Sequence, residues 1–392
     1  MQRTVLSGGQ VITPWVVLER GVVIFSGGKI EYVGQEYLPK PNDQLIDVTG
    51  KIITPGLIDL HIHGGGGHDV MYGTEEDVLA IAKNLLKSGV TSFVPSLYAA
   101  EMKQMFTTLD NINRAYKIQQ EKGSTESQIV GIYLEAPFMN PIARGGHPID
   151  AVISPVRKNY LELINRAGEL LKLVLVAPEV KGGMELIEYV LSRGLIAAIG
   201  HSEASYDQVV DAVKLGLDHV IHVFNGNDSG ISKREPGLVG AALNLDELFC
   251  ELICDGIHVH PANMKMVYKL KGTDKIVLIS DATKPAGMPD GDYPLADGRI
   301  MHVKNGVTSV DGTLPGTLSG STLGLNRGVC NMVELVGATL QEAVKMATVN
   351  PAKRLNLTNK GSLLAGKDAD IVVFSKGLEP EQIYLGGALV TY

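Results

Sequence analysis

The sequence predicts an α/β protein in which a (β/α)8 TIM-like barrel stands beside a small β-sandwich domain. Two observations predict it. Eight apolar runs alternate with amphipathic helical stretches between residues 55 and 354. The two ends of the chain, residues 1–54 and 355–392, are instead rich in short β-branched segments separated by glycines. Apolar parallel strands need cover from helices, and eight of them suggest closure into a barrel. The two ends would then pair into one small sandwich.

Each expected barrel strand is a short run of mainly apolar residues. The eight runs are 56–60, 90–95, 129–134, 173–177, 196–200, 219–224, 248–254 and 275–280. Helices are expected between them, for example at 74–88, 206–217 and 261–271, where apolar residues recur at helical spacing. Thr74 with Asp77 three residues later resembles a capping box. An open doubly wound sheet is the competing fold, but no glycine-rich dinucleotide fingerprint follows the first strand.

Composition and charge exclude several classes of protein. The 392 residues are 45% hydrophobic and carry a formal net charge of −8, without a basic run. This argues against nucleic acid or an anionic membrane as a partner. No apolar run reaches the roughly 18 residues that a membrane-spanning helix needs. Three cysteines are too few for a disulfide framework, so a cytoplasmic location is expected, with Cys250 and Cys254 in the core.

The chemistry of the sequence gathers where the apolar runs end. The first run ends in His61 and His63, which share one side of a strand because side chains alternate. Four other runs end in Glu135, in His201, in His222 and in Asp281. Barrel enzymes place their sites at the carboxyl ends of the strands. Histidine and carboxylate side chains are ligands of zinc and iron, so five such strand ends predict a metal site.

Several of these residues also have plainer interpretations. A histidine pair such as His61 and His63, taken alone, is more often two half-buried strand residues. Asp281 alone is more often a helix cap. Asp59 could orient a ligand or simply be hydrogen-bonded in the barrel floor.

The remaining histidines of the chain receive separate interpretations. His258 and His260 form a rival pair, but Gly256 breaks the preceding run and Pro261 suits a helix start. We therefore expect His258 to contact substrate and His260 to be structural. Structural roles are also expected for His68, His219 and His302.

The run at 55–63 resembles the signature of the amidohydrolase superfamily, and later motifs resemble the N-acetylglucosamine-6-phosphate deacetylase family within it. Those motifs lie in order along nearly the whole chain, at 134–138, 146–148, 200–202, 222–225, 234–237, 255–258, 280–282 and 316–321. The glutamate on the third strand is the specific part. Hydantoinase-like relatives are expected to use a lysine on the fourth strand, where this chain has Ala177-Pro178-Glu179.

The resemblance implies a role for each matching residue. One or two divalent metals (zinc, iron or manganese) would be bound by His61, His63, Glu135, His201, His222 and Asp281. Asp281 would also be the general acid/base. The substrate would be contacted by His147, which would also help catalysis by stabilising the oxyanion, and by Asn225, Gly226, Arg234, His258 and Leu318. Arg234, Asn225 and the backbone near Gly226 would hold a phosphate, with one basic contact crossing the interface of a homodimer.

The implied activity is removal of the acetyl group from N-acetylglucosamine-6-phosphate, giving acetate and glucosamine-6-phosphate. The galactosamine epimer, and cyclic amides or dipeptides, are alternative substrates, and a decayed scaffold is a non-enzymatic alternative. Two departures from the family pattern bear on which sugar is bound and leave the metal-binding residues unchanged. Ala136 replaces the usual glycine, and Gly226 followed by Asn227-Asp228 replaces the usual sequence after Asn225.

Overall fold

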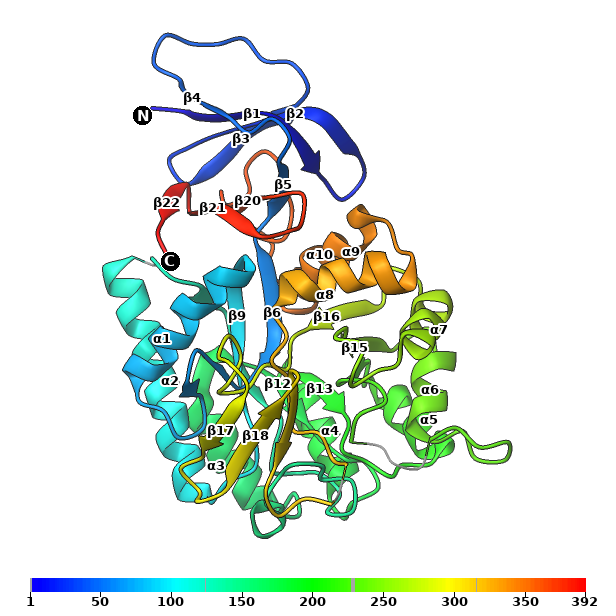
Figure 1. Ribbon diagram of the computed structural model, residues 1–392. Helices are drawn as coiled ribbons and strands as arrows, with labels where there is room; N and C mark the ends of the chain where they lie inside the picture. The colour runs from blue at the N-terminus through cyan, green and yellow to red at the C-terminus, as the bar shows by residue number, and fades with distance from the viewer. Residues whose placement is uncertain (1, 124, 227–229, 315) are drawn as a thin grey trace.

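The computed structural model describes residues 2–123, 125–226, 230–314 and 316–392. A barrel of strands surrounded by helices forms the larger part of the molecule (Figure 1). A separate sheet, made by both ends of the chain, lies at the top of the view, where strand β6 enters the barrel. The predicted fold class is confirmed. The domain boundaries at residues 54/55 and 354/355 stay a prediction.

The barrel strands follow the eight predicted runs. They are β6 (Leu57–Ile62), β9 (Val90–Leu97), β10 (Gln128–Ile129) with β11 (Ile132–Leu134), β12 (Leu171–Leu175), β13 (Ile196–Ile199), β14 (His219–Val220), β15 (Phe249–Ile253) and β16 (Ile276–Ile279). The third run is divided in two, and both pieces pair with β9. All neighbouring pairs are parallel. A parallel bridge between Ile62 and Ala282 joins the last strand region to the first and closes the barrel.

Helices cover the outside of the barrel between successive strands (Figure 1). They are α1 (Glu75–Leu85), α2 (Met102–Lys122), α3 (Arg157–Ala167), α4 (Gly183–Ser192), α5 (Tyr206–Leu215), α6 (Gly237–Asn244), α7 (Pro261–Lys271), α8 (Leu325–Asn331), α9 (Leu340–Ala347) and α10 (Val349–Arg354). Helix α1 begins with the expected capping box, in which Thr74 and Asp77 each accept the other's backbone N–H. This box satisfies two N–H groups that a helix start would otherwise leave unpaired.

The terminal sheet joins segments from opposite ends of the chain. Its strands are β1 (Thr4–Ile12), β2 (Val17–Ser26), β3 (Lys29–Gly34), β4 (Gln44–Asp47), β5 (Ile52–Pro55), β20 (Ile371–Phe374), β21 (Pro380–Leu385) and β22 (Ala388–Val390). The register of β1 shifts at Gly8 and Gly9, where Gly8 has a φ of +86°. Before the shift β1 pairs with β4, and after it β1 pairs with β5. β5 in turn pairs with β20, so the expected union of the two ends is confirmed.

A three-stranded antiparallel sheet follows the last barrel strand and has no counterpart among the predicted elements. Its strands are β17 (Gly291–Pro294), β18 (Ile300–Lys304) and β19 (Val307–Val310). Its small apolar core holds Leu295, Met301 and Val310, which also line the cavity described below. A two-stranded ribbon of β7 (Gly64–Gly65) and β8 (His68–Asp69) lies at the end of β6.

The hydrophobic core has two main parts. The barrel interior is filled by side chains such as Ile58, Leu60 and Val277, and a larger layer lies between the strands and the helices. Cys250 and Cys254 are buried and unpaired, as expected. Among the described residues, no helix is both long and apolar enough to cross a membrane.

Candidate active site

Five strand ends bring the predicted metal-binding side chains together inside the barrel mouth. His61 is the last residue but one of β6, and His63 follows that strand directly. Glu135 follows β11 directly. His201, His222 and Asp281 lie two residues beyond β13, β14 and β16. All six side chains are buried. His201 and Asp281 have positive φ angles of 43° and 50°, which are uncommon for non-glycine residues and turn the strand ends inward.

The Glu135 carboxylate is the centre of the cluster. Its oxygens lie 3.3 Å from the Nε2 of His61, 3.0 Å from that of His63, 3.4 Å from that of His201 and 3.2 Å from that of His222. The four imidazoles therefore surround one carboxylate from the ends of three strands, β6, β13 and β14. A carboxylate in this position can bridge two cations, each of which would also have histidine ligands.

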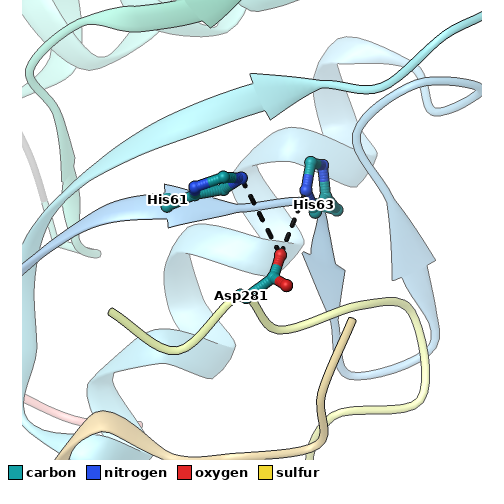
Figure 2. A group of neighbouring side chains, drawn as sticks. All are labelled: His61, His63 and Asp281. Atoms are coloured by element: carbon teal, nitrogen blue, oxygen red, sulfur yellow. Dashed lines mark ion pairs between the residues drawn. The ribbon is translucent and has the colours of Figure 1, made fainter. Parts of the chain in front are cut away.

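Asp281 completes one side of the cluster (Figure 2). Its Oδ1 lies 3.2 Å from the Nε2 of His63 and 3.8 Å from the Nε2 of His61. The backbone holds it in place, because its N–H donates to the carbonyl of His61 and its carbonyl accepts from the N–H of Ser321. The loop after β16 is thereby fixed to β6.

Hydrogen bonds at the far ring nitrogens orient three of the four histidines. The Nδ1 of His63 lies 3.0 Å from the carbonyl oxygen of Ser96, and that of His201 lies 2.8 Å from the carbonyl oxygen of Ala143. The Nδ1 of His61 lies 2.7 Å from the carboxylate of Glu251. Each acceptor requires a proton on Nδ1, so Nε2 is the nitrogen that faces the cluster and can coordinate a cation once it carries no proton.

The electrostatics of the cluster favour ionised carboxylates. Burial opposes ionisation of Glu135, but the neighbouring His63 and His61 hold its pKa well below its usual range. Burial likewise opposes ionisation of Asp281, and contact with His63 lowers its pKa. Burial lowers the pKa of His63, but the carboxylates of Glu135 and Asp281 prevail and raise it to about 10. A bound cation would compete with these protons for the same nitrogens.

The cluster fits a divalent cation. The Nε2 of His61 and the Oε2 of Glu135 are buried and make no hydrogen bond. Such an unpaired buried atom costs about 1–3 kcal/mol, which a cation would offset. Three sets of potential ligands lie close enough to share an ion: His61, His63 and Asp281; His61, Glu135 and His222; Glu135, His147 and His201. Because the sets overlap at Glu135 and His61, the site can hold one or two ions.

A cavity of about 480 Å³ opens above the cluster. His147, Asn225, Gly226, His258 and Leu318 line it, as expected for substrate contacts. The Nδ1 of His147 accepts the backbone N–H of Ala99 at 3.1 Å, so its proton lies on Nε2, toward the cluster. Burial lowers the pKa of His147 well below its usual value and keeps it neutral.

His258 and Gly226 also have defined surroundings. His258 donates from Nδ1 to Asp255 at 2.6 Å. Burial lowers the pKa of His258, but this hydrogen bond prevails and raises it. Gly226 has a φ of +61°, and a Cβ there would lie 2.5 Å from the Nδ1 of His201. Glycine at this position, one of the two departures from the family pattern, therefore allows the loop to approach His201 closely.

Arg234 is not brought to the cavity. It is exposed, and its backbone N–H donates to Ser232. None of the described residues 230–236 lines the cavity. Within one chain, therefore, Arg234 does not make the expected contact with a phosphate in this cavity. Asn227 and Asp228 lie outside the described residues. Arg144 and Arg299 are the arginines that line the cavity, and no lysine is among its described lining residues.

Three of the four histidines expected to be structural lie away from the cluster, and the fourth, His219, contacts Glu251 beneath it. His68 pairs with Asp77 at the start of α1, and His302 pairs with Asp292 and Asp311 on the surface. His260 caps α7 by accepting the N–H of Ala262. Asp59 accepts the N–H of Ser280, as one interpretation expected, and burial raises its pKa to about 6.

Sequence reasoning missed two residues at the site. Arg299 on the β17–β18 connection donates to the carbonyl of Gly146 at 2.7 Å, beside His147. Nothing in its local sequence distinguishes it. Glu251 is completely buried beneath the cluster and accepts hydrogen bonds from His61 and His219. Burial opposes its ionisation, but His61 and His219 lower its pKa to about 2. A charged residue in the middle of an apolar parallel strand was the signal that could have identified it.

The fold is a parallel barrel, and its mouth holds a cluster of histidines and carboxylates that fits a divalent cation. A family model described as the amidohydrolase family matches residues 52–390, so the chain belongs to the amidohydrolase family. Within that family it groups with deacetylases of amino-sugar phosphates. It is 35% identical to the N-acetylglucosamine-6-phosphate deacetylase of Lysinibacillus sphaericus, over 92% of this chain and 91% of that protein.

Two further relatives extend the comparison. The N-acetylgalactosamine-6-phosphate deacetylase of Escherichia coli O157:H7 is 36% identical over 87% of this chain and 88% of its own length. Among solved structures, the N-acetyl-D-glucosamine-6-phosphate deacetylase of Mycobacterium smegmatis, in complex with N-acetyl-D-glucosamine-6-phosphate, superimposes with a TM-score of 0.91 at 29% identity. That match covers 100% of both chains.

Proposed function

We propose that this protein is a metal-dependent deacetylase that hydrolyses N-acetylglucosamine-6-phosphate to glucosamine-6-phosphate and acetate. The observation that carries the proposal is the meeting of four histidine Nε2 atoms around the Glu135 carboxylate, with Asp281 beside them, under an open cavity. The related deacetylases match over most of the chain, which supports the choice of substrate class.

Zinc, iron or manganese would be held by His61, His63, Glu135, His201, His222 and Asp281. When bound, such an ion polarises a carbonyl oxygen and lowers the pKa of water toward about 7. An amide needs this help because its carbonyl is a weak electrophile and its amine leaves poorly. The metal-binding role of each residue is part of the proposal.

Asp281 would move the proton in both halves of the reaction. Its carboxylate is held ionised beside His63 and can accept the proton of the attacking water. The same carboxyl group then delivers the proton to the departing nitrogen of the sugar, which becomes the free amine as the C–N bond breaks. Its backbone anchors to His61 and Ser321 keep the side chain at the edge of the cluster throughout.

His147 would stabilise the negative oxygen that develops on the acetyl group. Ala99 fixes the tautomer that carries a proton on Nε2, and the neutral ring stands over the cluster. One donor in such a position is commonly worth about 3 kcal/mol. Asn225, the backbone of Gly226, His258 and Leu318 would hold the rest of the substrate. Fixing a remote phosphate positions the acetamide over the metals.

Arg234 enters the proposal only as a residue of a second subunit. The protein is proposed to be a homodimer in which the exposed Arg234 of one chain reaches the phosphate bound in the other. A guanidinium group suits this role because its fork donates two parallel hydrogen bonds. We also propose a cytoplasmic location, consistent with three free cysteines. An Arg234→Ala variant should raise KM for the phosphorylated sugar without changing kcat greatly, and sedimentation should give a dimer.

Acetate release tests the proposed activity. The substrates are N-acetylglucosamine-6-phosphate, N-acetylgalactosamine-6-phosphate and the two unphosphorylated sugars, with elemental analysis of the same sample. Fastest turnover of the glucosamine phosphate is expected. A preference for the galactosamine epimer is the specific alternative, given the Escherichia coli relative. Equal rates with and without the phosphate would contradict the phosphate site, and turnover only of hydantoins or dipeptides would contradict the deacetylase.

A further inference from the structure

A carboxylate beneath the metal cluster has no role in the reaction described above. Glu251 lies on β15, and its side chain is fully buried inside the barrel. Its Oε2 lies 2.7 Å from the Nδ1 of His61, which comes from β6. Its Oε1 lies 2.8 Å from the Nε2 of His219, which comes from the neighbouring β14. The carboxylate therefore connects three strands through two imidazoles.

The chemistry of these contacts fixes the protonation of His61. An ionised carboxylate only accepts hydrogen bonds, so the proton of His61 must lie on Nδ1. The Nε2 of His61 is then the nitrogen that faces Glu135 and Asp281, at 3.3 Å and 3.8 Å, and the one that can coordinate an ion. His219 holds the other carboxylate oxygen, so Glu251 cannot rotate away from His61 without losing a second buried hydrogen bond.

His61 differs from the other oriented histidines in the acceptor it uses. His63 and His201 donate from Nδ1 to neutral backbone carbonyls of Ser96 and Ala143. His61 donates to a carboxylate. A carboxylate partner fixes the ring and makes the coordinating nitrogen more basic, and loss of such a partner typically weakens metal binding by about 10- to 100-fold. The effect should fall on whichever ion His61 binds.

We propose that Glu251 is a positioning residue that determines whether a second divalent ion binds at His61, His63 and Asp281. The inference rests on the proposed function in taking the cluster to hold divalent ions. Glu251 touches neither the ion nor the substrate. Its Oε2 contacts the Nδ1 of His61 at 2.7 Å and, at 3.4 Å, the backbone N–H of His222. The effect is assigned to the shorter contact because only that one fixes the position of a proton on a coordinating imidazole. In this arrangement the other ion is held by Glu135, His201 and His222 and takes no ligand atom from His61, so its affinity should change less.

Zinc titration of the full chain, stripped of metal and without sugar, tests the proposal. Competition with a chromophoric chelator gives the number of ions and their affinities. In Glu251→Gln the second ion should bind about 10- to 100-fold more weakly, with the affinity of the first changed less. Glu251→Asp keeps the charge but withdraws the carboxylate, so it should weaken the same ion. Nitrogen-15 spectra of the imidazoles should show a changed Nδ1–H signal of His61 in the glutamine variant, because a neutral amide is a weaker acceptor than a carboxylate.

A variant lacking His61 provides the matched control. In a His61→Asn background, Glu251→Gln should leave the affinity of the remaining ion unchanged. The proposal is overturned if Glu251→Gln weakens both ions equally, if it still has an effect without His61, or if both ions keep their affinity. Thermal unfolding of each variant identifies a general loss of structure. If Glu251→Gln is destabilised in that way, the affinities are measured on Glu251→Asp instead, and unchanged affinities there would overturn the proposal. The titration does not measure acetate release. A protein that binds two ions but does not deacetylate would therefore refute the proposed activity and not the role of Glu251.

Discussion

Replacement of Asp281 by asparagine removes one function of the site and preserves its shape. Asparagine has the same outline as aspartate and tolerates the positive φ of 50° at this position. The two backbone hydrogen bonds, to His61 and from Ser321, do not involve the side chain. What is lost is the negative charge 3.2 Å from the Nε2 of His63 and the ability to accept a proton.

The size of the effect follows from those losses. General acid–base catalysis contributes roughly 10²- to 10⁴-fold to a rate. At about 1.36 kcal/mol for each tenfold change, this is about 2.7–5.4 kcal/mol of barrier. The backbone strain is unchanged, so the free energy of unfolding should move far less. We therefore expect kcat to fall by about two to four orders of magnitude in a folded protein.

The assay measures acetate release from N-acetylglucosamine-6-phosphate at saturating zinc, with the metal content determined on the same protein. Saturating metal separates loss of the proton acceptor from loss of a ligand. Asp255→Asn is a matched control, because Asp255 is a half-buried carboxylate just beyond the neighbouring strand and contacts His258 rather than the cluster. Its kcat should fall much less. Near-normal turnover of Asp281→Asn with full metal content would refute the assignment of Asp281 as the acid/base.

Three further predictions concern pH, metal and stability. The pKa of His258 is raised, and the imidazole is cationic below that pKa. Binding of glucose-6-sulfate, whose negative charge does not change with pH, should therefore weaken as the pH rises through it. An equally steep pH dependence in His258→Asn would contradict this prediction. Chelation of the metal should lower Tm reversibly, since an ion at a hundred times its Kd contributes about 2.7 kcal/mol; an unchanged Tm would show that no ion stabilises the fold. Thr74→Ala removes the cap of α1 and should cost about 1 kcal/mol in urea unfolding, against little for Thr107→Ala on the surface of α2; equal losses would mean that the capping box contributes nothing.

Much of the fold was predictable because its signals are local. Each barrel strand is a short apolar run and each helix has its own periodicity, as the capping box of Thr74 and Asp77 shows. The β17–β19 sheet was missed because its strands pair only with one another over a small core of Leu295, Met301 and Val310. That core is too small to produce a strong apolar pattern in the sequence.

The candidate site also contains residues that the sequence could predict and contacts that it could not. His61, His63, Glu135, His201, His222 and Asp281 could be selected because parallel strands in a barrel all end at one mouth, so position in the chain predicts position in space. The contact of Glu251 with His61 could not be predicted, because it crosses the barrel between strands 190 residues apart. The exclusion of Arg234 from the cavity depends on how one loop folds over the mouth, which no local pattern encodes.

The sequence by itself determined the alternation of strands and helices, the pairing of the two chain ends and the six side chains that meet at the barrel mouth. The spacing of apolar residues and their position along the chain were sufficient for these features, because in a regular helix or strand the spacing of residues fixes the directions of their side chains. Only the tertiary structure decided which nitrogen of each histidine faces the cluster. That choice depends on partners from distant strands and loops, namely Ser96, Ala143 and Glu251, whose hydrogen bonds form only when the barrel closes.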